Sequence, residues 1–146
     1  MATTTISGHT PTPLRGPILW GLILGGIQAA SPLAFRWLDP ATVHALGLAL
    51  IAAIYIGFAV ADGRPRVIAT ETLVASVFVV AAAAAVTNTA WILVAGYAGH
   101  GLKDFWQHRS TFVANTRWWP PFCAAVDFLV AFVLVIEIVA GVNFHQ

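Results

Sequence analysis

Residues 67–106 read VIATETLVASVFVVAAAAAVTNTAWILVAGYAGHGLKDFW, and this stretch decides the fold. A single helix of that length would extend about 60 Å, twice the roughly 30 Å thickness of the hydrocarbon core of a bilayer. Thr87, Asn88 and Thr89 interrupt the apolar run, and asparagine tolerates the backbone angles of tight turns. The sequence therefore predicts two helices, over 67–86 and 90–108, with Asn88 as the pivot between them.

The composition excludes a soluble domain. Hydrophobic residues make up 59% of the 146 residues and charged residues 9%, and the mean hydropathy is +0.82. Soluble domains carry about 25% charged residues. The formal charge of +1 comes without a basic stripe, so nucleic-acid binding has no electrostatic basis. The single cysteine, Cys123, excludes a disulfide within the chain and a multi-cysteine metal site.

Three further apolar stretches, 17–38, 41–61 and 119–142, bring the predicted number of spans to five, with four as the alternative. With five spans and a cytoplasmic N-terminus, six of the seven basic residues lie on the cytoplasmic side, as the positive-inside rule requires. They are Arg15, Arg64, Arg66, Lys103, Arg109 and Arg117. Four spans would give a split of three to four. We expect an all-α transmembrane bundle, 17–146, after a short disordered cytoplasmic tail, 1–16.

Gly21 and Gly25 form a G-x-x-x-G pair in the first span. Small residues at this spacing let two helix backbones approach closely in lipid. The pair predicts either packing within the chain or the contact face of a homo-oligomer.

Most polar residues lie at the ends of the predicted helices. The exceptions are concentrated in the fourth and fifth predicted helices. His100, Asp104 and His108 are each four residues apart and share one helix face, as do Cys123 and Asp127 on the next helix. His100 is nine residues from Arg109, and Asp127 is eight residues from Trp119. Both therefore lie about 12–14 Å inside the membrane, and we expect them to face each other.

Three interpretations of this cluster stay open. In the first, Asp127 accepts a hydrogen bond from His100 and the pair only locks the helices together, while Lys103 neutralises Asp104 or extends to the interface. In the second, His100, Asp104 and Asp127 bind a divalent metal, with Cys123 or His108 nearby; His100 and His108 are about 12 Å apart along the helix and cannot share one ion. In the third, His100 and Asp127 form a buried acid–base pair.

The pattern H-G-x-x-D at His100–Asp104, followed by W-W-P-P-F-C-x-x-x-D at Trp118–Asp127, resembles a family of small uncharacterised bacterial integral-membrane proteins. The resemblance covers about the last third of the chain. It implies a multi-pass protein of a bacterial inner membrane and names no activity.

We predict a small membrane protein with a cytoplasm-facing pocket that binds or transforms a small or lipidic ligand. His100, Asp127 and Asp104 are the candidate catalytic residues. The candidate ligand-binding residues are Lys103, His108, Cys123 and Trp119. The alternatives are a proton- or ion-coupled carrier or channel acting as a homo-oligomer, and a structural subunit of a larger membrane complex. The sequence leaves open whether the protein is an enzyme, and it requires no cofactor.

Overall fold

The computed structural model describes residues 14–114 and 116–145, and within these ranges the chain forms helices and no strand. The all-α class is thus confirmed. The elements are α1 (Arg15–Ala29), a short 3₁₀ turn η1 (Ser31–Leu33), α2 (Pro40–Asp62), α3 (Pro65–Thr87), α4 (Trp91–Ser110) and α5 (Trp119–Val139). Most of the predicted tail lies outside the described residues, and α1 begins at Arg15, inside the range assigned to that tail.

The first predicted span, 17–38, is too long: α1 ends at Ala29. The hydroxyl of Ser31 donates to the carbonyl of Gln28 at 2.6 Å, which satisfies one of the last carbonyls of the helix. Pro32 follows within η1, and because proline has no backbone N–H it cannot continue the hydrogen-bond ladder of α1. The apolar composition continues beyond this point, but the backbone does not continue as an α-helix.

The long apolar stretch divides where it was predicted to, although by a different mechanism. Asn88 follows α3 with φ −124° and ψ −97°, which is not the left-handed conformation. Its side-chain amide instead donates to the carbonyl of Ala84 at 2.9 Å and caps the end of α3. Asn88 therefore ends the helix through its side chain.

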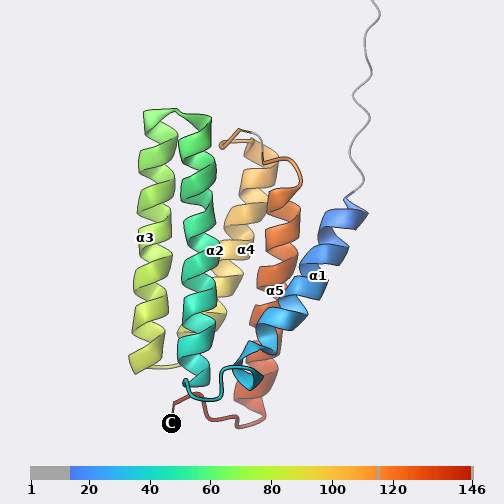
Figure 1. Cartoon of the computed structure of the whole chain (residues 1–146), viewed down its shortest axis with the longest axis vertical. Helices are drawn as coiled ribbons and strands as arrows, with labels where there is room; N and C mark the ends of the chain where they lie inside the picture. Colours follow the sequence, from blue (N-terminus) through green and yellow to red (C-terminus); the bar gives the residue numbers. More distant parts are fainter. Residues whose placement is uncertain (1–13, 115, 146) are drawn as a thin grey trace, which may run out of the picture.

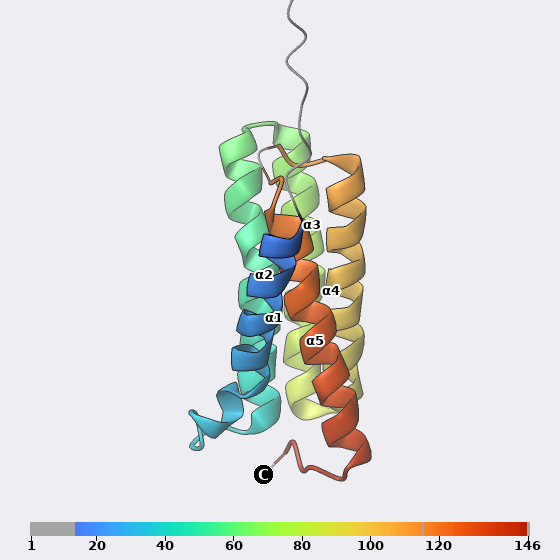
Figure 2. The ribbon, with the colours of Figure 1, turned by 90° about the vertical axis from the view of Figure 1, so that its right-hand side faces the viewer.

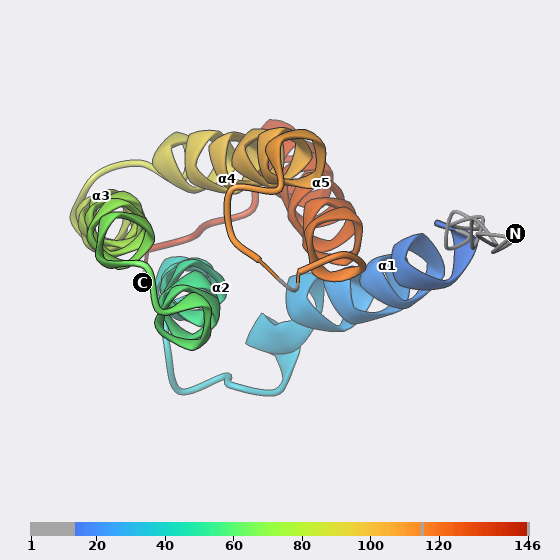
Figure 3. The ribbon, with the colours of Figure 1, turned by 90° about the horizontal axis from the view of Figure 1, so that it is seen from above.

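The five helices run up and down along one axis, so that the described chain begins at one end of the bundle and finishes at the other (Figure 1). α2 packs along α3, α4 along α5, and α1 along α5, whereas α1 barely touches α2. Seen from above, α1 extends away from the other four helices (Figure 3), and the turned view shows it lying over α5 (Figure 2). α5 therefore occupies a central position between α1 and α4.

Four helical segments are long and apolar enough to cross a membrane: Arg15–Leu33, Pro40–Asp62, Pro65–Thr87 and Trp119–Val139. This supports a multi-pass membrane protein. α4 is not among them because it carries several polar residues. Those residues point inward: the buried stripe of α4 includes His100, Asp104 and Gln107, whereas Leu102 and Phe105 on its outer face are 62% and 51% exposed.

The Gly21/Gly25 face packs within the chain, against α5. A Cβ added at Gly21 would collide with the carbonyl oxygen of Phe122 and lie 2.8 Å from the Cβ of Ala125. A Cβ at Gly25 would lie 3.1 Å from the Cα of Val126. Of the two roles predicted for this face, the structure gives it the intramolecular one, since α5 covers the surface that a second protomer would need.

A polar contact joins two connections at one end of the bundle. Asp62, at the end of α2, accepts hydrogen bonds from Arg64 Nε at 2.6 Å and from the backbone N–H of Ala114 at 2.7 Å. Arg64 also donates to the carbonyl of Phe112 at 2.6 Å. The turn between α2 and α3 is thereby tied to the segment between α4 and α5.

Candidate functional site

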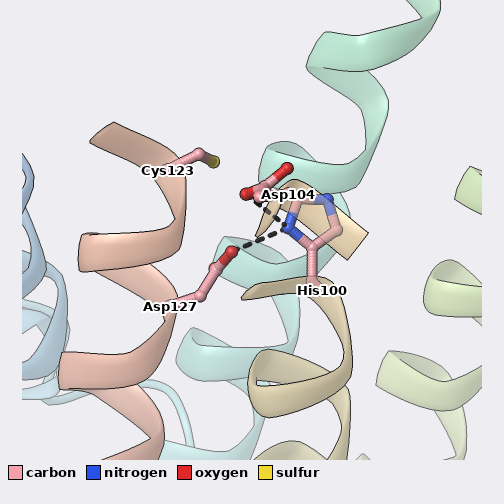
Figure 4. Close-up of side chains that lie close together, drawn as sticks. All are labelled: His100, Asp104, Cys123 and Asp127. Atoms are coloured by element: carbon pink, nitrogen blue, oxygen red, sulfur yellow. Dashed lines mark hydrogen bonds and ion pairs between the residues drawn. The ribbon is translucent and has the colours of Figure 1, made fainter. Parts of the chain in front are cut away.

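α4 and α5 supply the centre of the site from their facing surfaces. On α4, His100 and Asp104 are one helical turn apart, and on α5, Cys123 and Asp127 are likewise one turn apart. The two helices are antiparallel neighbours, so the two pairs meet (Figure 4). All four side chains are buried.

His100 lies between the two carboxylates. Its Nδ1 is 2.8 Å from Oδ2 of Asp127, within hydrogen-bonding distance, and 3.5 Å from Oδ2 of Asp104 (Figure 4). The predicted contact between His100 and Asp127 is thus present. As a donor, Nδ1–H can make one strong hydrogen bond, and Asp127 accepts it.

Cys123 completes the cluster. One donor atom each from His100, Asp104, Cys123 and Asp127 can be chosen so that all four lie within 4.8 Å of one another. His108, the other residue predicted to lie near a metal, is not in this group. We call His100, Asp104, Cys123 and Asp127 the buried quartet.

The quartet contains few hydrogen-bond donors for its acceptors. Within the described part of the chain, the Tyr55 hydroxyl and the Cys123 thiol are neutral groups that interact with Asp104, and Oδ1 of Asp127 has no hydrogen-bond partner. The side chains of Asp104 and Asp127 are fully buried. A buried carboxylate whose charge is not balanced is costly, so this arrangement calls for a proton or a cation to compensate that charge.

Lys103 does not supply that cation. Its Nζ forms an ion pair with Oε2 of Glu71 on α3 at 2.7 Å and lies 3.0 Å from the centre of the Tyr55 ring on α2. The expectation that Lys103 either neutralises Asp104 or extends to the interface is therefore wrong. The Lys103 side chain is only 12% exposed, and its charge is balanced by that of Glu71.

Two aromatic side chains enclose the imidazole of His100. The Phe78 ring on α3 meets it edge-on with centroids 5.0 Å apart, and the Tyr55 ring does so at 5.9 Å. Every helix from α2 to α5 thus contributes to the walls. Neither Glu71 nor Tyr55 was among the residues predicted for this site.

An apolar groove of about 540 Å³ runs along the outside of the site, between α1, α4 and α5. Ile18 and Leu22 form one wall, Phe105 forms the other, and α5 forms the floor. The lining residues are apolar except for Asp104 and His108. Asp104 is fully buried and borders the groove from beneath its surface, while its carboxylate is directed toward His100 in the quartet.

The remaining predicted ligand-binding residues lie at the edges of this arrangement. His108 is partly exposed and lines the groove one turn beyond Asp104. Trp119 is also partly buried and packs on Phe58 of α2 with ring centroids 5.4 Å apart. Neither residue joins the quartet.

No protein-family model, curated protein or solved structure matches this chain. The geometry of the site is therefore the basis for the function proposed below.

Proposed function

We propose that this protein is a five-span membrane protein with a cytoplasmic N-terminus that binds a lipid-like molecule in the groove between α1, α4 and α5. In this proposal, Asp104 and the His100–Asp127 pair act on the polar end of that molecule by acid–base chemistry. The observation that carries the proposal is that the apolar groove lies directly over the buried Asp104, whose carboxylate is 3.5 Å from His100.

The assignment of α4 as a fifth span is supported by its inverted amphipathic character. His100, Asp104 and Gln107 face the other helices, and the outer face before the last turn is apolar, with Leu102, Phe105 and Trp106 each at least 50% exposed. This distribution suits a helix whose outer face contacts lipid. The mean hydropathy of α4 does not reveal this separation of faces, because it counts the polar residues whichever side of the helix they lie on.

The chemistry of the groove favours a ligand with a long apolar part and an uncharged polar end. Along α5 the lining extends from Pro120 to Phe132, about 18 Å of helix. The carboxylate oxygens of Asp104 can accept hydrogen bonds from a hydroxyl group, whereas a second carboxylate there would be repelled. An acylated alcohol fits both requirements.

Each residue of the acid–base group has a separate task. Asp127 accepts the hydrogen bond from Nδ1 and so fixes the orientation and tautomer of the imidazole. Asp104 is the carboxylate nearest the groove and would exchange a proton with the ligand hydroxyl. The same Nδ1–H of His100 lies 3.5 Å from Asp104 and holds a polar N–H group beside the carboxylate that would exchange this proton.

The proposal can be tested by photolabelling the protein in detergent micelles with a diazirine-bearing monoacylglycerol. We expect labelled peptides from the groove floor on α5 and from Phe105. Leu22→Trp, which fills the groove, should reduce the labelling at least fivefold. Leu19→Trp is the matched control, because Leu19 is an exposed residue of the same helix that does not line the groove, and it should label like the wild type.

Asp104→Asn should also weaken labelling, since the amide is a poorer acceptor for a hydroxyl. Equal labelling of the wild type and Leu22→Trp, with both proteins folded, would refute the groove as the binding site.

A further inference from the structure

We infer that the buried quartet is a binding site for one divalent transition-metal ion, and that Zn²⁺ fits it best. The ligands would be Nδ1 of His100, one carboxylate oxygen each from Asp104 and Asp127, and the sulfur of Cys123. The inference deepens the proposed function at the same residues: the ion would replace the Nδ1 proton that otherwise joins His100 to Asp127.

The donor set matches a borderline metal. Zn²⁺ accepts imidazole nitrogen, thiolate sulfur and carboxylate oxygen, and it prefers four ligands in a tetrahedron. Hard ions such as Mg²⁺ and Ca²⁺ require more oxygen ligands than the quartet offers. The mixed set of one nitrogen, one sulfur and two carboxylates therefore favours zinc and its spectroscopic substitute Co²⁺.

The distances are close to those of a bound ion. With bond lengths of about 2.0 Å to nitrogen or oxygen and about 2.3 Å to sulfur, neighbouring ligand atoms in a tetrahedron are about 3.3 to 3.5 Å apart. The observed separations are 2.8 Å and 3.5 Å around Nδ1, and all four donor atoms lie within 4.8 Å. Side-chain movements of about 1 Å would bring them to ligand positions.

Charge gives an independent reason. Asp104 and Asp127 are fully buried, and the Tyr55 hydroxyl and Cys123 thiol next to Asp104 are neutral groups that do not balance a carboxylate charge. The nearby ammonium of Lys103 is paired with Glu71. A divalent cation between the two carboxylates would compensate their charge, which one imidazole proton can do only in part.

Metal content of the purified protein tests the inference, without any groove ligand present. The protein should be purified through a tag that contains no histidine and dialysed against Zn²⁺ and then against metal-free buffer. We expect about one zinc per chain by mass spectrometry. Co²⁺ should give visible absorption of a tetrahedral site and a near-ultraviolet band from sulfur-to-cobalt charge transfer.

Variants identify the ligands. Loss of a second-shell partner weakens metal binding by about 10- to 100-fold, so loss of a direct ligand in Asp104→Asn should weaken it by at least about 100-fold. Cys123→Ser should remove the sulfur-to-cobalt band. Glu137→Gln is the matched carboxylate control, because Glu137 lies near the other end of α5, and it should keep both zinc and the band.

Less than about one tenth of an equivalent of zinc in folded wild-type protein, together with no cobalt band, would overturn the inference. The same holds if Cys123→Ser leaves the cobalt spectrum unchanged. These outcomes are separate from the photolabelling result: labelled but metal-free protein would leave the acid–base proposal standing alone. Metal binding without labelling would instead support the metal site and refute the binding of a lipid-like molecule in the groove.

Discussion

Lys103 is adjacent in sequence to Asp104 but directs its charge to another helix. The Lys103–Glu71 ion pair at 2.7 Å is almost fully buried and lies against the Tyr55 ring. Breaking a buried pair by removing one partner costs about 3–5 kcal/mol because the other charge stays in the interior, whereas removing both costs less. This pair therefore stabilises the contact between α3 and α4 beside the quartet.

We predict that Glu71→Gln and Lys103→Met each destabilise the protein and that the double variant is more stable than the sum of the single effects implies. The expected coupling is about 1–3 kcal/mol, as found for residues in direct contact. Unfolding in mixed micelles with increasing sodium dodecyl sulfate would measure it. Strictly additive effects would contradict the ion pair.

At the residue level, the sequence predicted the contact between His100 and Asp127 but not the contact between Lys103 and Glu71, although the residues of each pair lie at equal depth. His100 and Asp127 were paired because they lie at equal depth on consecutive helices. Glu71 is six residues from the start of α3 and Lys103 six residues from Arg109, so they are also at equal depth. The depth of a residue along the bundle follows from the number of residues between it and the helix end. Which of two residues at that depth becomes the partner depends on the rotation of each helix about its own axis, and residue numbers do not give that rotation.

At the element level, each helix is defined more by its ends than by its composition. The predicted stretch 41–61 is close to α2, Pro40–Asp62, because Pro40 starts the helix and Gly63 ends it in the left-handed conformation, φ +79°. The first span failed at its C-terminal end, where the apolar composition continues past the backbone break at Ser31 and Pro32. Composition locates apolar segments, whereas these local signals set helix ends.

α1 depends on its glycine contact with α5, and this gives a prediction for the element. Gly21→Ala places a methyl group against the backbone of Phe122, so we expect α1 to shift and the melting temperature in detergent to fall by several degrees. Gly26→Ala is the control. Nothing lies within 4 Å of a Cβ there, and alanine favours the helix by up to about 1 kcal/mol over glycine.

An unchanged melting temperature for Gly21→Ala would show that α1 does not rest on α5 as described. Because α1 forms one wall of the groove, the same variant should also reduce labelling by the monoacylglycerol probe. Gly26→Ala should label normally.

For the whole molecule, the arrangement of the helices carries information that hydropathy lacks. Four helical segments qualify as spans on length and composition, but the described chain passes along the bundle axis five times (Figure 1). The difference is α4, whose buried polar residues His100, Asp104 and Gln107 are enclosed by its neighbours. The distribution of basic residues in the sequence favoured five spans. The packing agrees with that prediction, because the stripe of polar residues on α4 faces the interior of the bundle.

Topology is tested with reporter fusions at three positions. If the five-span proposal holds, a fusion after Gly63 should report the cytoplasm, and fusions after Asn88 and Gln146 should report the opposite side. Alkaline phosphatase and green fluorescent protein, which are active on opposite sides of a bacterial inner membrane, give complementary signals. A cytoplasmic signal at Gln146 would restore the four-span alternative.

The contact of Asp62 with Arg64 and Ala114 has a consequence for how the groove is reached. It fastens α2 and α3 to the connection between α4 and α5, whereas α1 has almost no contact with α2. α1 is instead held almost entirely by α5, and it does not pack along α4. We therefore expect molecules to enter the groove sideways from the bilayer, between α1 and α4.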